Sequence, residues 1–353
     1  MPLPHLTQAR APLTCEIDAV NEYGEQQKVS IPAERALTVY VDKRELVTLM
    51  TLGAQPELLV LGYLRNQRLV TQVSDIESIT VDWEVGAAAV KTRHGIENIE
   101  EKTARRVVTT GCGQGSVFGR LMDEVDQIVL PADACITQGQ LYALVNTIRL
   151  KETTYKSAGS VHACALFALT GATPDILLFV EDVGRHNAID TIAGWMWMNM
   201  APTLVASRTT LPPEGAAAPA DWQSQIRGPG WSGSEVSTLP AACGSLPLRP
   251  DEAGSAAPAG EDDAPTPVAS GLVFYTTGRL TSEMVIKSAQ MGVPVVVSRS
   301  GITQMGHQVA QAVGLCAIGR ATNKRFVCYT SPQRLQLQPE LAGPKTRTSV
   351  VEV

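Results

Sequence analysis

Apolar and polar residues alternate in short runs near the start of the chain and then change to a helical spacing. Alternation places every second side chain on one face of a β-strand, whereas a spacing of three to four residues gives a helix an apolar face. The predicted elements are strands at residues 37–41, 45–49, 79–83 and 88–91 and a helix at residues 56–65. Together they predict a small N-terminal α+β domain at residues 31–105, preceded by a flexible lead-in at residues 1–30.

A longer region then alternates strand-like and helix-like patterns. Its predicted strands are residues 161–169, 176–180, 272–276, 293–298, 315–319 and 325–330, and its predicted helices are residues 138–151, 185–200, 281–291 and 302–313. Such alternation is typical of an α/β sheet covered by helices on both faces. We therefore expect a second domain at residues 106–335, followed by a tail at residues 336–353.

One segment interrupts this second domain. Residues 201–270 are dense in Pro, Gly, Ala and Ser and lack the apolar periodicity that a packed core requires. We expect a disordered insertion here, and Cys243 within it is more consistent with an incidental cysteine than with a catalytic one.

Composition narrows the functional classes. The 353 residues carry a formal net charge of -6, which does not favour nucleic-acid binding, and no apolar run reaches the length of about 20 residues that spans a membrane. The seven cysteines include no Cys-x-x-Cys pair, which argues against a zinc ribbon or a thioredoxin-type pair. No secretory leader is recognisable, so we expect a cytoplasmic protein with free thiols.

The strongest chemical candidate is Cys112, within the run Thr109-Thr110-Gly111-Cys112-Gly113-Gln114-Gly115-Ser116. The glycines remove bulk around the thiol and permit backbone angles that other residues avoid. A thiol displayed in this way suits a sulfur carrier, although an ordinary tight turn with an inert cysteine has the same local pattern.

Polar residues also gather where several predicted strands end. At the carboxyl edge of an α/β sheet, such residues commonly bind ligands, and open backbone N–H groups at helix starts favour anions. Cations and hydroxyl groups at successive strand ends predict a site for a phosphate-bearing ligand. The candidate binding residues are Asp182, Arg185, His186, Thr277, Gly278, Arg279, Ser298, Arg299, Arg320, Ala321, Thr322, Asn323, Lys324 and Arg325.

A further candidate is His162, in the run Ser160-Val161-His162-Ala163-Cys164. The zinc site of cytidine deaminases opens with His-Ala-Glu, but Cys164 replaces the glutamate and no Pro-Cys-x-x-Cys follows. We therefore expect no zinc, and we predict that His162 faces the substrate or has a structural role.

Taken together, these segments resemble the FdhD family of formate dehydrogenase accessory sulfurtransferases. The resemblance covers about residues 30–335 outside the insertion, and its most specific marker is Glu181-Asp182-Val183-Gly184-Arg185-His186-Asn187-Ala188. Further matches are Gly111-Cys112-Gly113, residues 157–163, Gly278-Arg279 with residues 282–285, residues 297–300 and residues 325–330. The resemblance implies a cytidine-deaminase-like three-layer domain without zinc, a smaller N-terminal domain and a homodimer.

The resemblance also implies a function. Sulfur would pass as a persulfide from a cysteine desulfurase to Cys112, and then to the molybdenum or tungsten of a bis(molybdopterin guanine dinucleotide) cofactor that activates formate dehydrogenase. The guanine dinucleotide contacts would fall on residues 320–325. The chain departs from the family where many members have a second loop cysteine, because Gly115 stands there. Arg320 stands where relatives often have an aromatic residue, and Thr322 where they often have arginine.

Two other functions remain compatible with the residues. In the first, the chain binds the cofactor as a chaperone without sulfur chemistry, and Cys112 is incidental. In the second, a deaminase-like scaffold hydrolyses a nucleobase or nucleotide, which the missing glutamate and cysteine ligands argue against. Substitution of Cys112 discriminates the first function, and a metal assay discriminates the second.

Overall fold

The N-terminal part forms a five-stranded sheet packed against one helix. The computed structural model describes residues 2–96, 107–108, 115–116, 125–151, 153–206 and 271–342. The sheet has the order β1-β6-β7-β4-β5, and α1 covers it. Its elements are β1 (His5–Leu6), β4 (Arg35–Val41), β5 (Arg44–Thr51), α1 (Pro56–Asn66), β6 (Ile76–Asp82) and β7 (Ala87–Thr92). The strands and helix predicted for this region are therefore confirmed, with the β4–β5 turn at Asp42 and Lys43, both at positive φ.

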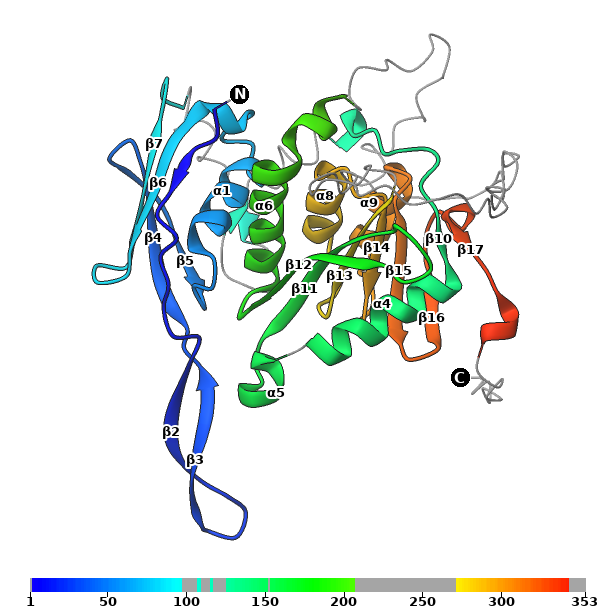
Figure 1. The fold of residues 1–353 in the computed structure, drawn as a ribbon, viewed down its shortest axis with the longest axis horizontal. Helices are drawn as coiled ribbons and strands as arrows, with labels where there is room; N and C mark the ends of the chain where they lie inside the picture. The colour runs from blue at the N-terminus through cyan, green and yellow to red at the C-terminus, as the bar shows by residue number, and fades with distance from the viewer. Residues whose placement is uncertain are drawn as a thin grey trace, which may run out of the picture.

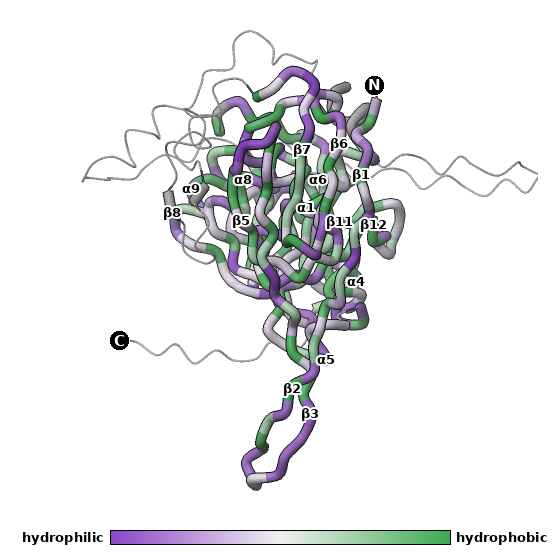
Figure 2. The backbone as a smooth tube through the Cα atoms, turned by 90° about the vertical axis from the view of Figure 1, so that its left-hand side faces the viewer, coloured by the Kyte–Doolittle hydropathy of each residue, from purple (hydrophilic) through white to green (hydrophobic). Residues whose placement is uncertain are grey.

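The prediction of a flexible lead-in at residues 1–30 is wrong. β1 joins the first sheet beside β6, and β2 (Thr14–Val20) pairs along its whole length with β3 (Gln26–Pro32). Figures 1 and 2 show this hairpin extending away from the rest of the molecule, with a mostly hydrophilic chain. The Asn21 side chain accepts hydrogen bonds from the backbone N–H groups of Tyr23 and Glu25 and so fixes the connecting turn.

The second part is built on a mixed six-stranded sheet of order β12-β11-β13-β14-β15-β16. Its central strands β13, β14 and β15 are parallel, and β11 and β16 run antiparallel to their neighbours. The strands are β11 (His162–Ala168), β12 (Asp175–Asp182), β13 (Leu272–Thr276), β14 (Val295–Ser298), β15 (Cys316–Thr322) and β16 (Arg325–Cys328). Consequently β12, β13, β14 and β15 all end at the same edge of the sheet, which we call the ligand edge.

Helices cover both faces of this sheet, as the alternating pattern predicted (Figure 1). One face packs against α6 (Arg185–Ala206), α8 (Ser282–Gln290) and α9 (Gln304–Ala312), and the other packs against α4 (Gln138–Lys151). The short α5 (Thr154–Ala158) lies at the ligand edge beside β3. The fold is thus mixed α/β, with a three-layer arrangement in its second part.

The two parts meet through α1 and α6, which lie side by side between the sheets (Figure 1). A Cβ atom built on Gly62 of α1 would lie 1.6 Å from the Asp190 carbonyl oxygen, and one on Gly194 of α6 would lie 2.0 Å from the Leu58 carbonyl oxygen. The two helix backbones are therefore in direct contact, and α6 contributes Trp197 and Met198 to the core of the first sheet. The domain boundary predicted near residue 105 falls between the two sheets in the chain. In space the α1–α6 pair lies between these sheets and joins them.

Two other predictions change at their edges. Residues 201–206 continue α6, and the rest of the predicted insertion up to residue 270 lies outside the described residues. The tail predicted from residue 336 begins inside a strand, because β17 (Leu335–Gln336) pairs with β10 (Ile136–Thr137). Each described helix is too short or too polar to traverse a lipid bilayer.

Candidate functional site

The predicted binding residues gather at the ligand edge because of the strand directions. β12 and β13 both run antiparallel to β11, so the start of β11 at His162 lies between their ends. His162 is directly opposite Asp182, and the turns after β13 and β14 follow along the same edge. Residues from four separate segments are thus brought together, as the sequence predicted.

Positive charge dominates this edge around His162. Burial lowers the pKa of the His162 imidazole, and three nearby guanidinium groups lower it further by repelling the imidazolium form. These belong to Arg185, Arg279 and Arg299. Three permanent cations around a neutral imidazole form a natural binding place for a phosphate or another polyanion.

Arg299 is held by an aromatic residue that the sequence reasoning missed. Its guanidinium carbon lies 5.3 Å from the centre of the Tyr155 ring, within cation–π range. Tyr155 belongs to α5, whose first turn donates backbone hydrogen bonds to the Glu181 carboxylate, at 2.9 Å from Thr154 and 3.1 Å from Tyr155. Glu181 therefore fixes the short helix that positions Arg299.

A pocket of about 120 Å³ opens beside Arg299 on the face covered by α4. It is lined by Tyr142, Val145, Asn146, Ile148, Arg149, Tyr275, Arg299, Ala321, Thr322 and Asn323. Two aromatic rings, two amides and two arginines are suitable for a nitrogenous base and its phosphates. Lys324 also contacts α4, since its carbonyl oxygen accepts a 3.1 Å hydrogen bond from the Tyr142 hydroxyl.

The predicted turn at residues 320–325 is shorter than expected. β15 continues to Thr322 and β16 starts at Arg325, so only Asn323 and Lys324 form the turn. Arg320, Thr322, Asn323, Lys324 and Arg325 are exposed, whereas Ala321 is buried in the sheet core. The Ala321 side chain packs on the α4 side, where it lines the pocket beside Arg299, and its predicted ligand contact stays a prediction.

The hydroxyl residues after β13 and β14 mainly build the turns. The buried Ser298 hydroxyl donates to the Gly278 carbonyl oxygen at 2.7 Å, and the Thr277 hydroxyl accepts from the Ala163 N–H at 3.0 Å. A Cβ on Gly278 would lie 2.7 Å from the Arg185 Cδ. A larger residue here would push the Arg185 side chain from its observed position, which accounts for glycine without a ligand contact.

Asp182 has a structural role instead of the predicted ligand contact. One carboxylate oxygen accepts hydrogen bonds from the Gly184 N–H and the Asn187 amide, and the other accepts from the Thr51 hydroxyl and the Leu52 N–H. Burial raises the pKa of Asp182, and these donors oppose the rise. Because both oxygens are occupied, Asp182 joins the ligand edge to the N-terminal part.

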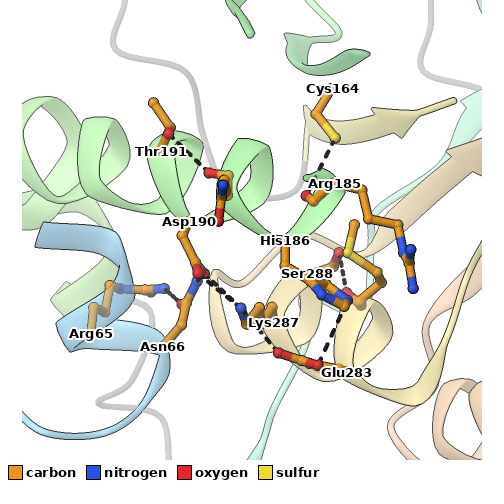
Figure 3. Close-up of polar contacts among 12 residues, drawn as sticks. Arg65, Asn66, Cys164, Arg185, His186, Asp190, Thr191, Glu283, Lys287 and Ser288 are labelled. Atoms are coloured by element: carbon orange, nitrogen blue, oxygen red, sulfur yellow. Dashed lines mark hydrogen bonds and ion pairs between the residues drawn. The ribbon is translucent and has the colours of Figure 1, made fainter. Parts of the chain in front are cut away.

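His186 is also internal and belongs to a buried charged network shown in Figure 3. The ammonium group of Lys287 lies 2.9 Å from Asp190 and 3.2 Å from Glu283, and the Asn66 amide donates to Asp190 at 2.7 Å. Burial lowers the pKa of His186 to about 3, so its 3.6 Å contact with Glu283 is not an ion pair at neutral pH. The predicted cofactor contact of His186 is therefore replaced by support of the α6–α8 junction.

The candidate carrier thiol, Cys112, lies outside the described residues. Its neighbouring strands β8 (Val107–Val108) and β9 (Gly115–Ser116) pair antiparallel. Among the described cysteines, Cys164 is fully buried, and burial raises its pKa to about 12, which leaves it unreactive. No group of His, Cys, Asp or Glu side chains in the described residues is arranged to hold a metal ion, and the absence of zinc stays a prediction.

The sequence did contain a signal for the missed residues. Tyr155 lies two residues before the Ser157–Ala163 run, and Glu181 is the first residue of the most specific motif. Tyr142 and Arg149 carried no such signal, because a polar residue on a covering helix is indistinguishable from an ordinary surface residue until the helix is placed.

Comparison with known proteins supports the same family. The chain is 26% identical over 324 residues to "Sulfur carrier protein FdhD" of Bacillus subtilis, with 89% of this chain and 94% of the relative covered. It is 24% identical over 328 residues to the protein of the same name from Bacillus pumilus, with 91% and 92% covered.

A solved structure has the same fold. It is a protein of Desulfotalea psychrophila described as a candidate formate dehydrogenase accessory protein, with a TM-score of 0.58 and 17% sequence identity. The match covers 92% of this chain and all of that protein. The FdhD/NarQ family model matches residues 32–210 and 259–336. These matches extend over both sheets and the ligand edge, and the chain belongs to the FdhD/NarQ family.

Proposed function

We propose that this protein is a sulfur carrier for formate dehydrogenase and that Cys112 carries the sulfur as a persulfide. The cationic ligand edge is the observation that carries the proposal, because a carrier that sulfurates a nucleotide-bearing cofactor must bind phosphates. The names of the Bacillus relatives support the sulfur-carrier role. The proposal includes a cysteine desulfurase as donor, a homodimer and a cytoplasmic location.

The transfer chemistry needs one thiolate and no metal of the protein's own. The Cys112 thiolate attacks the outer sulfur of the desulfurase persulfide, a new S–S bond forms, and the desulfurase cysteine leaves as its thiolate. The persulfide is then presented to the molybdenum or tungsten of the bound cofactor, a soft centre that favours sulfur ligands. This makes the protein a sulfurtransferase whose substrate is the cofactor.

The ligand edge would hold that substrate by its phosphates and guanines. Arg279 and Arg299 provide charge-assisted hydrogen bonds to phosphate oxygens, and Tyr155 keeps the second guanidinium in place. The pocket beside α4 would receive a guanine, with Thr322 and Asn323 at its rim. His162, neutral among the cations, would donate or accept one hydrogen bond without adding charge.

Intact-protein mass spectrometry tests the carrier role. After incubation with a cysteine desulfurase and cysteine, the wild-type chain should gain about 32 Da, and Cys112→Ser should not. Cys15→Ser is the matched control, because Cys15 is a free, exposed thiol on the β2–β3 hairpin. Loading that persists in Cys112→Ser would refute the assignment.

A binding titration tests the ligand edge and, together with the persulfide-loading result, separates the carrier from a cofactor-binding chaperone. GDP, which represents the nucleotide end of the cofactor, should bind at least tenfold more weakly to Arg299→Ala than to Lys91→Ala. Lys91 is an exposed cation on the first sheet and serves as the control. GDP binding without persulfide loading would favour the chaperone.

A further inference from the structure

Two cysteine thiols face each other on the last two strands of the six-stranded sheet. The Sγ atoms of Cys316 on β15 and Cys328 on β16 are 3.9 Å apart. Cys328 pairs with Ile318, two residues from Cys316, so the thiols are diagonal neighbours on the face covered by α4. Cys316 is buried, whereas Cys328 is partly exposed.

The environment differentiates the two thiols. The hydrogen bond between them lowers the pKa of Cys328 and raises that of Cys316, so Cys328 is the one that ionises first. In such an arrangement the partly exposed thiolate can attack a sulfur of an outside partner. The buried thiol can then attack the sulfur of the first cysteine. Cys328 also lies only three residues from Arg325 on β16, about 10 Å from the ligand edge.

We propose that Cys328 and Cys316 form a resolving pair that accepts a sulfane sulfur from a persulfide and releases it as hydrosulfide. The inference rests on the proposed sulfur-carrier function for its biological purpose, because that function is what would bring a persulfide to this protein.

The chemistry balances in two steps. First, the Cys328 thiolate attacks the outer sulfur of the donor persulfide, and the donor leaves as a thiolate. Second, the Cys316 thiol gives its proton to the outer sulfur of the Cys328 persulfide anion, and the Cys316 sulfur attacks the Cys328 sulfur bonded to carbon. The Cys316–Cys328 bond forms, the bond between the two persulfide sulfurs breaks, and the outer sulfur leaves as hydrosulfide. The pair loses two electrons, the sulfane sulfur gains them and becomes sulfide, and the persulfide itself is the oxidant. A thiol reductant such as glutathione returns the disulfide to two thiols.

The geometry permits this bond after a small movement. A disulfide requires the sulfurs to approach from 3.9 Å to about 2.05 Å, which involves side-chain rotation and a small adjustment between the strands. Among the described strands, β16 is the outermost of its sheet and pairs with β15 alone, so it can adjust without disturbing a further strand of this group.

The test uses the full chain with Cys112→Ser, so that the proposed carrier thiol cannot contribute. After treatment with glutathione persulfide, this chain should release about one equivalent of hydrosulfide, lose about 2 Da and yield a linked Cys316–Cys328 peptide. Adding Cys316→Ala should lower the hydrosulfide yield at least tenfold and leave a gain of about 32 Da on Cys328. Adding Cys328→Ala should abolish both the hydrosulfide release and the gain of about 32 Da at residue 328.

Cys135→Ala is the matched control, since Cys135 is a partly exposed cysteine near Cys316 and should not be required. Unchanged hydrosulfide release in Cys316→Ala or Cys328→Ala would overturn the proposal, as would a disulfide that links Cys316 to Cys135. If an alanine variant unfolds, the peptide map of the chain with only Cys112→Ser still decides which cysteines are linked. Failure of Cys112 to load from a desulfurase would refute the carrier role and leave this result unaffected.

Discussion

The contact between the α1 and α6 backbones predicts a stability change whose sign is diagnostic. Alanine in place of glycine inside a helix normally stabilises it by about 1 kcal/mol. At Gly194 the added methyl group would instead lie 2.0 Å from the Leu58 carbonyl oxygen, and at Gly62 it would lie 1.6 Å from the Asp190 carbonyl oxygen. Both obstacles are backbone atoms, which cannot rotate aside.

The magnitude follows from these opposing effects. Overpacking of a filled interior costs about 1–3 kcal/mol and occasionally more, and a backbone obstacle on a rigid helix belongs to the upper part of that range. After the helix-propensity gain, we expect Gly194→Ala to lower the free energy of unfolding by about 2 kcal/mol. For a domain of this size that corresponds to a decrease in Tm of about 4–8 °C.

Urea unfolding followed by tryptophan fluorescence measures the effect. Trp197 on α6 is a suitable reporter, because it packs near α1 with the Arg65 guanidinium 5.6 Å from its ring. Gly171→Ala is the control, since a Cβ there meets nothing within 4 Å, and we expect a change within about 0.5 kcal/mol. The double variant Gly62→Ala/Gly194→Ala should cost less than the sum of the two single changes, because both act on one interface. Equal or greater stability of Gly194→Ala would refute the close contact.

Two further outcomes follow from the site. Asp182→Ala should lower the free energy of unfolding by about 3 kcal/mol or more, because four buried donors lose the carboxylate that accepts their hydrogen bonds. An unchanged urea midpoint of unfolding would contradict the structural role of Asp182. In NMR titrations, the pKa of His162 should be below 6.5 in the free protein, because burial and the nearby arginines disfavour the imidazolium form. It should rise when GDP binds, since the nucleotide's phosphates offset the repulsion from these arginines. A pKa of 6.5 or above in the free protein would contradict the electrostatic argument.

The strands of the second sheet and the helices that cover it were predictable, because each buries apolar residues at a spacing that the sequence shows. The strand at residues 272–276 is mostly apolar and buried throughout, and the helix at residues 304–312 keeps its apolar residues on one side. The β2–β3 hairpin was not predicted, although Cys15 and Ile17 alternate with polar residues and pair across the strands with Ile31 and Val29. All of its side chains are at least partly exposed, so no buried core supports this short alternation. Backbone pairing and the Asn21 turn define the hairpin instead.

The candidate site was predictable in position but only partly in role. Strand ends identified the ligand edge, yet residue type could not distinguish Glu181 from Asp182. Successive side chains on a strand point to opposite faces, so Glu181 reaches α5 while Asp182 reaches the N-terminal part. The contact of Gly62 with Gly194 was equally hidden, because a glycine within a helix does not indicate which distant residue lies against it.

The direction of α6 has a consequence for engineering the chain. This helix starts at the ligand edge with Arg185 and runs for 22 residues to the opposite end of the sheet, where β13 also begins. Residues 207–270 are therefore joined to the fold at two points remote from Arg279 and Arg299. Shortening this segment, or replacing it with a fluorescent reporter, would alter the chain at the end of the sheet away from Arg279 and Arg299, which is the end where β15 begins with Cys316.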